Sequence, residues 1–309
     1  METININSEF PLVTLFVPSY NHEKYIQDTV QSIIDQSYVN IELLIIDDGS
    51  NDKSRDIIAA LSLKCEERFT RFEFIKAAHQ GLTSSLNQAI NWADGKYFAM
   101  LASDDIYYPN KISDQIPLME SDEFLMGLFG GCDLIDSESN IVDEIIPREN
   151  IFLFDSIIRR EHSIITPTQL LRTKGLLKVG GYPEELYIED WYMWLALTKA
   201  GGKIKVINQK YVQYRLHEDN MSKNIPKMHK GRMDILNKFQ DSKFYNYSKG
   251  KVFLGSSIEY SWLDKNKALH FLLKAIQSTA KVIFTKEFFR ASLRFFVPTL
   301  IANSLKKIK

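Results

Sequence analysis

The sequence predicts an α/β fold in which a mainly parallel sheet is flanked by helices and followed by a helical C-terminal appendage. Through the first half of the 309-residue chain, short apolar runs alternate with segments of helical periodicity, a pattern typical of strand–helix–strand units. Acidic pairs follow two of the apolar runs, and ligands of open α/β sheets bind beyond such strand ends. Apolar residues make up 45% and charged residues 25% of the chain, as in a globular protein.

The first strand is expected at Leu12–Pro18, which is an almost uninterrupted apolar segment. Apolar residues then recur at helical spacing and predict a helix from about His22 to Ser37 with one buried stripe. The second strand is expected at Ile41–Ile46, where the run is apolar on both faces, as in a strand covered by helices on both sides. A further helix around Leu61 and a strand at Phe72–Ile75 continue the alternation.

The segment GLTSSLNQAINWADG predicts a helix that ends at Gly95, and KYFAMLASDD contains the next strand. Further along, apolar runs near Leu125–Leu134 and Ile204–Ile207 are separated by loops and helices, and the alternation is less regular. We expect the main domain to cover residues 1–226 and helices packed as hairpins to fill residues 227–309.

Cysteine usage and the first residues indicate the compartment. Cys65 and Cys132 lack the spacing of metal ligands, so the sequence predicts neither a zinc site nor a disulfide framework. The start METININSEF is polar and acidic, unlike a signal peptide, and a cytoplasmic location is expected. No nucleic-acid partner is expected.

The C-terminal segment is strongly basic although the whole chain has a net charge of −1. Residues 265–309 contain ten Lys or Arg and one acid, Glu287, which leaves +9 there and −10 in the rest of the chain. The segment also contains Phe288, Phe289, Phe295 and Phe296. We therefore expect it to lie on an anionic membrane surface, and the alternative is a packing surface in a homodimer. Its longest uncharged run, 295–305, is shorter than the roughly 20 residues that a spanning helix needs.

Two pairs of carboxylates are candidate ligand-binding residues. Asp47 and Asp48 follow the second strand, and Asp104 and Asp105 follow a later one. Adjacent carboxylates at a strand end suit Mg²⁺ or Mn²⁺, which would neutralise a leaving diphosphate. The alternatives are that the second pair favours the start of a helix near Pro109 and that the first pair belongs to an ordinary turn.

Two later segments also carry candidate functional residues. Glu189 and Asp190 precede an apolar helical run, where a carboxylate can act as a general base or simply be an N-terminal helix acid. Arg215 and His217 lie in a polar loop after an apolar strand, where a histidine is either functional or merely solvated.

Read together, these segments resemble the family-2 inverting glycosyltransferases with the GT-A fold, in particular bacterial enzymes that assemble surface polysaccharides. VTLFVPSYNHEKYIQDTVQSIIDQSYVNIELLIIDDGSNDKS resembles the family's opening nucleotide-binding half, and GLTSSLNQAINWADGKYFAMLASDD resembles the block that ends in the metal motif. VGGYPEELYIEDWYMWLAL resembles the acceptor-side block, and YRLHEDNMS resembles the closing block. The resemblance covers roughly residues 11–222 and implies a Rossmann-like sheet.

The resemblance implies a nucleotide-binding role for several residues. Pro18 and Tyr20 would shape the pocket for the base, and Asp48 would accept a hydrogen bond from a uracil-type ring or the ribose. Asn87 would lie near the nucleotide as well.

The resemblance also implies the residues around the donor diphosphate. Asp104 would face the ribose or the donor sugar, Asp105 would hold the metal, His217 would contact the metal or the diphosphate, and Arg215 would be a nearby cation. The metal motif is Ser-Asp-Asp rather than Asp-x-Asp, and an arginine often found near Ser85 in the family is absent.

The activity implied is inverting transfer of a hexose to a sugar hydroxyl of a lipid-diphosphate-linked oligosaccharide, in O-antigen or capsule biosynthesis at the inner face of the cell membrane. The donor would be a nucleotide-diphosphate sugar, with UDP-glucose the first choice and UDP-galactose and N-acetylated sugars close to it. Asp190 would be the general base, Glu189 is the competing base, and Mn²⁺ or Mg²⁺ would be the cofactor.

Other functions fit the sequence less well. A dinucleotide-dependent oxidoreductase would need Gly-x-Gly-x-x-Gly after the first strand, where the chain has Pro-Ser-Tyr-Asn. A sugar-phosphate nucleotidyltransferase would need a Gly-rich, basic loop there, and none is present in the sequence. A polyprenyl-phosphate sugar synthase and a catalytically idle sugar-binding scaffold remain alternatives.

Overall fold

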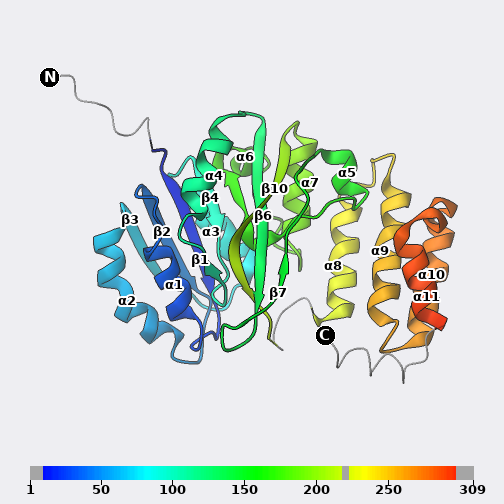
Figure 1. Cartoon of the computed structure of the whole chain (residues 1–309), viewed down its shortest axis with the longest axis horizontal. Helices are drawn as coiled ribbons and strands as arrows, with labels where there is room; N and C mark the ends of the chain where they lie inside the picture. The colour runs from blue at the N-terminus through cyan, green and yellow to red at the C-terminus, as the bar shows by residue number, and fades with distance from the viewer. Residues whose placement is uncertain (1–9, 218–222, 297–309) are drawn as a thin grey trace. The chain divides into compact units, whose positions relative to one another are not determined.

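The computed structural model describes residues 10–217 and 223–296, and it separates the chain into two compact units (Figure 1). The first unit consists of Met1–Phe154, Ser163–Glu185 and Met193–Glu218. The second unit consists of Asp155–His162, Leu186–Tyr192 and Asp219–Lys309. It therefore contains the helical C-terminal region together with two segments from earlier in the chain.

A ten-stranded sheet runs through the described part of the first unit in the order β3-β2-β1-β4-β9-β6-β10-β5, with β7 beside β6 and β8 beside β10. The strands are β1 (Val13–Ser19), β2 (Ile41–Asp47), β3 (Arg71–Lys76), β4 (Tyr97–Met100), β5 (Ile106–Tyr107), β6 (Leu125–Ile135), β7 (Ile141–Ile145), β8 (Asn150–Phe152), β9 (Leu170–Arg172) and β10 (Lys203–Arg215).

Strand direction decides where the site can form. Strands β3, β2, β1 and β4 are parallel, β9 is antiparallel to both β4 and β6, and β10 is parallel to β6. The carboxyl ends of β1, β2, β4, β6 and β10 therefore lie at one edge of the sheet. The α/β fold is confirmed, and the antiparallel strands β5, β7, β8 and β9 lie in the part of the chain where the sequence alternation is irregular.

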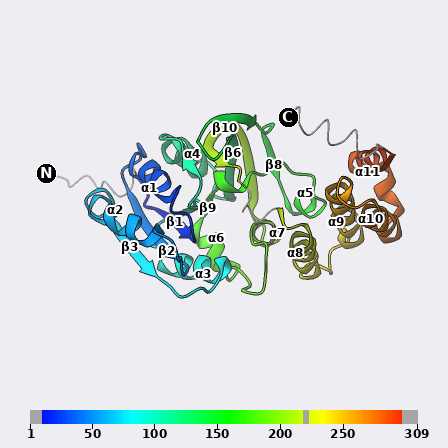
Figure 2. The same ribbon diagram turned by 90° about the horizontal axis from the view of Figure 1, so that it is seen from below.

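Helices cover both faces of this sheet. Figure 2 shows α1, α2 and α4 on one side of the strands and α3 and α6 on the other. The helices are α1 (Ile26–Ile34), α2 (Ser54–Arg68), α3 (Leu82–Trp92), α4 (Lys111–Glu120) and α6 (Thr173–Lys178), with a short 3-10 turn η2 (Thr166–Thr168).

The first helix shows why the local sequence folds in this way. Ile26, Val30 and Ile33 recur at helical spacing, all three are fully buried, and they pack in the same apolar cluster as Leu43 of β2. Full burial of an aliphatic side chain of this size contributes about 1.5–3 kcal/mol to folding. Strand β2 is buried at every position, as its continuous apolar run predicts.

The second unit is helical. Helix α9 contacts α8, α10 and α11, and its small apolar core contains Phe253, Leu254, Ala275, Val282 and Ala291. Its helices are α5 (Phe154–Ile158), α8 (Ile225–Asn237), α9 (Tyr245–Tyr260), α10 (Lys265–Ser278), the 3-10 helix η4 (Ala280–Phe284) and α11 (Lys286–Phe296). Helix α7 (Asp190–Lys199) begins in the second unit and ends in the first.

Within the described residues, no helix combines the length and the apolar composition needed to cross a bilayer. Part of the basic segment expected to contact a membrane, residues 297–309, lies outside the described residues, as do the side chains of Phe295 and Phe296.

Candidate active site

Four of the residues singled out in the sequence lie at the carboxyl edge of the sheet in the first unit. Tyr20 follows β1, Asp48 follows β2, Asp104 follows β4, and His217 follows β10. They are far apart in the sequence, and the shared direction of their strands gathers the segments that carry them along one edge.

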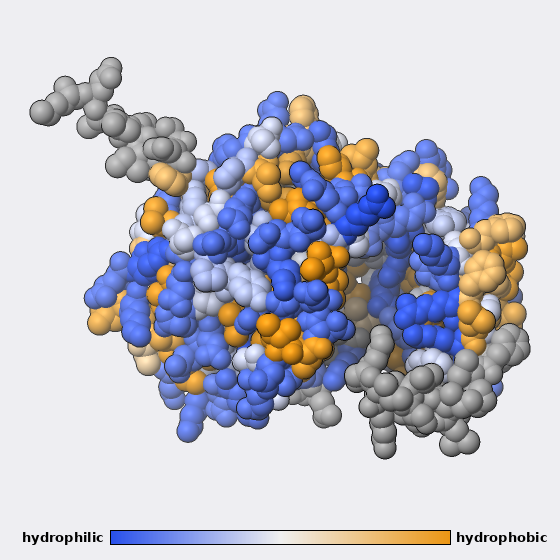
Figure 3. Space-filling view, in the orientation of Figure 1, coloured by the Kyte–Doolittle hydropathy of each residue, from blue (hydrophilic) through white to orange (hydrophobic). Residues whose placement is uncertain are grey.

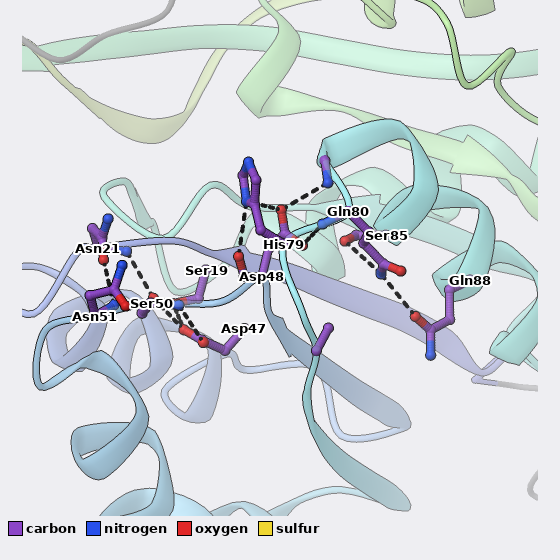
Figure 4. A network of polar contacts seen from close by, with 12 residues as sticks. Ser19, Asn21, Asp47, Asp48, Ser50, Asn51, His79, Gln80, Ser85 and Gln88 are labelled. Atoms are coloured by element: carbon purple, nitrogen blue, oxygen red, sulfur yellow. Dashed lines mark hydrogen bonds and ion pairs between the residues drawn. The ribbon is translucent and has the colours of Figure 1, made fainter.

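The Asp48 carboxylate holds the loop that leads into α3 (Figure 4). Asp48 Oδ1 accepts a hydrogen bond from the backbone N–H of Gln80 at 2.7 Å, and Oδ2 accepts one from that of Gly81 at 2.9 Å. The backbone φ of Gly81 is +89°, a conformation that glycine adopts without the strain of a β-carbon. Asp48 thus fixes a turn at the mouth of the site while its side chain keeps 10% exposure.

An aromatic pair stands beside this turn. The rings of Tyr20 and His79 lie 4.8 Å apart between centroids, and His79 Nδ1 lies 3.0 Å from Asp48 Oδ2. Tyr20 is 43% exposed, so its ring is available for stacking with a planar base. Pro18, the last residue but one of β1, is partly exposed next to it.

Asp47 has a different environment from its neighbour. It is fully buried, pairs with Arg55, and accepts hydrogen bonds from the backbone N–H and the hydroxyl of Ser50 and from the Ser19 hydroxyl. These contacts close the turn after β2, which is the ordinary turn role that the sequence left open for this residue.

Asn87 is occupied by the protein backbone. Its Oδ1 accepts from Tyr182 N at 2.8 Å, and its Nδ2 donates to Tyr182 O at 2.7 Å. Gly181 comes so close that an added β-carbon would lie 2.5 Å from Asn87 Oδ1. Asn87 ties α3 to the loop after α6, and a nucleotide contact for it stays a prediction.

His22, Asp104 and His217 form a cluster in which one ligand atom of each lies within 4.8 Å of the others. His217 Nε2 lies 2.7 Å from Asp104 Oδ2, and His22 Nδ1 lies 2.7 Å from the hydroxyl of Ser103. The two imidazole rings are nearly perpendicular, with centroids 5.7 Å apart. Two imidazole nitrogens and one carboxylate oxygen fit a divalent transition-metal ion such as Mn²⁺ better than Mg²⁺, which prefers oxygen ligands.

Asp105 lies behind this cluster and is not one of its members. Its carboxylate is fully buried, and Oδ1 accepts a hydrogen bond from the backbone N–H of Arg215 at 2.9 Å. Oδ2 has no hydrogen-bond partner among the described residues. Burial, and then the neighbouring Asp104 carboxylate, raise the pKa of Asp105 well above its usual range. The metal role expected of Asp105 stays a prediction, whereas the carboxylate oxygen that lies near the two imidazole nitrogens belongs to Asp104.

Arg215 clamps the loop that carries the acidic pair. Its side chain is 1% exposed, and Nε donates to the backbone oxygen of Asp104 at 2.8 Å. Nη1 donates to the backbone oxygens of Asp136 at 3.0 Å and Ser137 at 3.3 Å, and to the Ser139 hydroxyl at 2.9 Å. The guanidinium therefore joins the ends of β4, β6 and β10, and a role as a cation beside the diphosphate stays a prediction.

Two histidines of the site have no role in the expectations drawn from the sequence. His22 stands in the turn after β1, and His79 follows β3, so both occupy strand ends at the same edge as the acidic pairs. That position is the signal that could have drawn attention to them, since strands β1 and β3 both end at this edge.

The two candidate bases belong to the second unit. Glu189 immediately precedes α7, and Asp190 is the first residue of that helix. Burial, and then the adjacent Asp190 charge, raise the pKa of Glu189 to about 8. In the same unit, the Arg160 guanidinium stacks over the Trp191 ring at 5.2 Å. Burial and then the nearby Arg232 charge lower the pKa of Arg160, whereas nearby acids, Asp190 among them, raise it.

The chain is similar to known glycosyltransferases in sequence and in fold. The family described as Glycosyl transferase family 2 matches residues 14–177. The UDP-Glc:alpha-D-GlcNAc-diphosphoundecaprenol beta-1,3-glucosyltransferase WfgD of Escherichia coli is 30% identical over 233 residues, which cover 75% of this chain and 87% of that protein.

An uncharacterized glycosyltransferase of Rickettsia felis is 27% identical over 276 residues, which cover 82% of this chain and 44% of that protein. The chain spans less than two thirds of the length of several curated relatives that it matches. Among solved structures, the mannosyltransferase PcManGT of Pyrobaculum calidifontis, in complex with GDP-Man and Mn²⁺, superposes with a TM-score of 0.63 at 13% identity. That match covers 97% of this chain and 87% of that one, and it shows a shared fold.

Proposed function

Because the chain belongs to glycosyl transferase family 2 and has the GT-A fold, we propose that it transfers a hexose from a nucleotide-diphosphate sugar with inversion at the anomeric carbon. The observation that carries the proposal is the meeting of Asp104 and His217 at 2.7 Å, at the same sheet edge as Tyr20 and Asp48. A base-stacking residue and a metal-ligating set on one edge match the two ends of a nucleoside diphosphate.

The nucleotide would enter beside Tyr20. Its ring would stack on the base together with His79, and the turn pinned by Asp48 would border the ribose. Asp48 already accepts two backbone hydrogen bonds, so its contribution is mainly to position the loop, with its remaining lone pairs free to accept from the ring or ribose.

A divalent ion would be held by Asp104 and His217, with His22 as the third protein ligand. When bound, the ion would neutralise charge on the departing nucleoside diphosphate. We assign this role to Asp104 rather than Asp105, because the buried Asp105 carboxylate faces the backbone of Arg215. Asp105 and Arg215 then keep the Asp104 loop in place.

Asp190 would act as the general base toward the acceptor hydroxyl. A base must be ionised at the working pH, and the raised pKa of Glu189 leaves that side chain largely protonated near pH 7. The acceptor oxygen, as it loses its proton to the base, attacks the anomeric carbon from the side opposite the nucleotide. The product therefore has the inverted configuration. This part requires Asp190 to reach the acceptor when both substrates are bound.

The acceptor is proposed to be a sugar hydroxyl of a lipid-diphosphate-linked oligosaccharide in surface-polysaccharide synthesis, with UDP-glucose as the first donor to test. The Escherichia coli relative is named as a glucosyltransferase from UDP-Glc to a GlcNAc-diphosphoundecaprenol, which supports both choices. Such an acceptor places the reaction at the inner face of the cell membrane.

A donor panel with Mn²⁺ tests the proposal. UDP-glucose, UDP-galactose, UDP-GlcNAc and GDP-mannose are incubated with the full chain, with and without a GlcNAc-diphosphate-lipid acceptor, and the released nucleoside diphosphate is measured. We expect acceptor-stimulated release from one UDP-sugar, and UDP should raise the melting temperature only when Mn²⁺ is present. Release from no donor together with no metal-linked shift would refute the proposal.

Variants locate the ion. Asp104→Asn should abolish the Mn²⁺-dependent part of the UDP shift, whereas Asp56→Asn, an exposed aspartate on α2, should behave as wild type. If Asp105→Asn loses the shift and Asp104→Asn keeps it, with unchanged melting of both apo proteins, the metal ligand is Asp105 and the assignment to Asp104 is wrong. Asp190→Asn should stop transfer and leave UDP and Mn²⁺ binding intact.

A further inference from the structure

The second unit exposes a set of large apolar side chains along α10, η4 and α11, which we call the C-terminal apolar face. Phe284 is 82%, Phe289 60% and Leu293 68% exposed. The face is completed on α10 by Leu269, Leu273 and Ile276, which follow one another at helical spacing and are also exposed. An exposed group of this size in a folded unit indicates an interaction surface.

These side chains are exposed because other residues anchor the same helices. Ala291 is buried and Phe288 packs against the small core that α9 shares with α10 and α11. Helix α11 directs Ala291 and Phe288 toward that core. Its outer side therefore carries Lys286, Phe289 and Leu293, which are three and four positions apart. The apolar stripe of α11 therefore has no partner within the described part of the unit.

The face is surrounded by positive charge. Residues 265–296 contain seven Lys or Arg and one acid, Glu287. Glu287 is paired with Lys251 of α9 at 2.6 Å, so it offsets a charge outside this segment. Five of the cations are exposed: Lys267, Lys274, Lys281, Lys286 and Arg290. Lys267 is paired with Asp264 at 3.6 Å, so the net excess near the face comes from the other four. Figure 3 shows apolar side chains along the outer rim of this region with strongly hydrophilic ones beside them.

We propose that the C-terminal apolar face docks on the anionic surface of a lipid bilayer, with Phe284, Phe289 and Leu293 in the interfacial layer and the surrounding lysines and Arg290 against the headgroups. Docking would hold the enzyme where a lipid-linked acceptor is found, and this purpose, though not the docking itself, rests on the proposed function.

Charge selects the bilayer over a second copy of the chain. A self-complementary contact would bring two surfaces with the same excess of Lys and Arg together, which costs free energy unless acids intervene. Among residues 265–296 the one acid, Glu287, is already paired. An anionic lipid surface supplies the opposite charge together with an apolar layer.

Vesicle sedimentation with the full chain tests the inference. We expect binding to vesicles of phosphatidylcholine mixed with phosphatidylglycerol, little binding to phosphatidylcholine alone, and a decline as salt is added. Lys286→Gln and Arg290→Gln should each lower the partition coefficient about fivefold, the size expected for one cation near the surface.

The apolar part is tested by a matched pair of double variants. Phe289→Ser with Leu293→Ser should lower partitioning about tenfold or more, since both side chains would leave the interfacial layer. Leu63→Ser with Phe124→Ser, in the first unit at 67% and 56% exposure, should leave it unchanged. Because all four side chains are exposed, both proteins should melt as wild type does.

The outcomes separate this inference from the proposed function. No binding of wild type to anionic vesicles, equal loss in both double variants, or a dimer in light scattering that the Phe289/Leu293 variant loses would overturn it. Transfer to a water-soluble acceptor should be equal in all these variants. Vesicle binding without nucleotide-sugar turnover would refute the proposed function alone, and turnover without vesicle binding would refute the membrane surface alone.

Discussion

Substitution of Arg215 by lysine tests whether this residue clamps the site or binds the diphosphate. The guanidinium donates to three backbone oxygens, those of Asp104, Asp136 and Ser137, and to the Ser139 hydroxyl, at 2.8–3.3 Å. Lysine keeps the charge and lacks the planar fork, so it can replace only part of this set.

The expected cost follows from the oxygens left without a donor. A buried polar group that loses its partner costs about 1–3 kcal/mol. The Asp104 oxygen is the buried partner, whereas Asp136 and Ser137 lie at partly exposed and exposed positions where water can replace the donor. If the lysine ammonium leaves the Asp104 oxygen without a donor, the free energy of unfolding of the first unit should fall by about 1–3 kcal/mol. For a unit of this size that corresponds to a melting temperature lower by about 2–12 °C.

Two measurements are needed, thermal melting without ligand and Mn²⁺-dependent UDP binding. The clamp role predicts a large loss in the first and, because the Asp104 loop is loosened, a loss in the second. The control is Arg148→Lys at an exposed position, which should change neither. If Arg215→Lys melts as wild type does and loses only turnover or diphosphate affinity, Arg215 contacts the donor and the clamp argument is wrong.

Three further predictions concern single side chains. Burial and the adjacent aspartate raise the pKa of Glu189 from 4.5 to about 8, so the folded state binds this proton more tightly than the unfolded state does. The stability that protonated Glu189 contributes is therefore complete below about pH 4.5 and is lost as the pH rises through about 8. Glu189→Gln should therefore flatten the decline in melting temperature between about pH 4.5 and 8, and an unchanged decline would contradict the cause assigned here. Asn87→Ala removes two hydrogen bonds to the backbone of Tyr182 and should lower the free energy of unfolding by about 1–3 kcal/mol in urea denaturation. Asn91→Ala, exposed on the same helix, should cost under about 1 kcal/mol. His22→Asn should weaken Mn²⁺ binding in a titration followed by electron paramagnetic resonance, and unchanged affinity would leave only Asp104 and His217 as ligands.

The fold of the first half was accessible from local pattern. The apolar run Leu12–Pro18 corresponds to β1, the run Ile41–Ile46 to β2, and the helical stripe after His22 to α1. These elements form with short connections, and their apolar period sets which side chains are buried. The antiparallel strand β9 has only three residues, too few for such a period to be recognised.

The candidate site could be located from the sequence but not assigned in detail. Acids at strand ends and the family resemblance predicted the edge at which Asp48 and Asp104 lie. The same reasoning placed Asn87 near the nucleotide and Arg215 beside the diphosphate, and both roles stay predictions. In the structure the Asn87 amide bonds the backbone of Tyr182, and Nε and Nη1 of Arg215 donate to backbone oxygens. A polar residue near a ligand and one that holds the surrounding loop look alike in a sequence, because the partner atoms come from distant segments.

The order of residues thus settles the α/β class, the family and the edge of the sheet where chemistry can occur, since these depend on local periodicity and on motifs. Tertiary packing decides which of two adjacent carboxylates meets His217, because successive side chains in the turn after β4 point in different directions and His217, just after β10, comes more than a hundred residues later. It also decides that Arg215 is buried as a clamp and that Phe289 and Leu293 stay outside the C-terminal core.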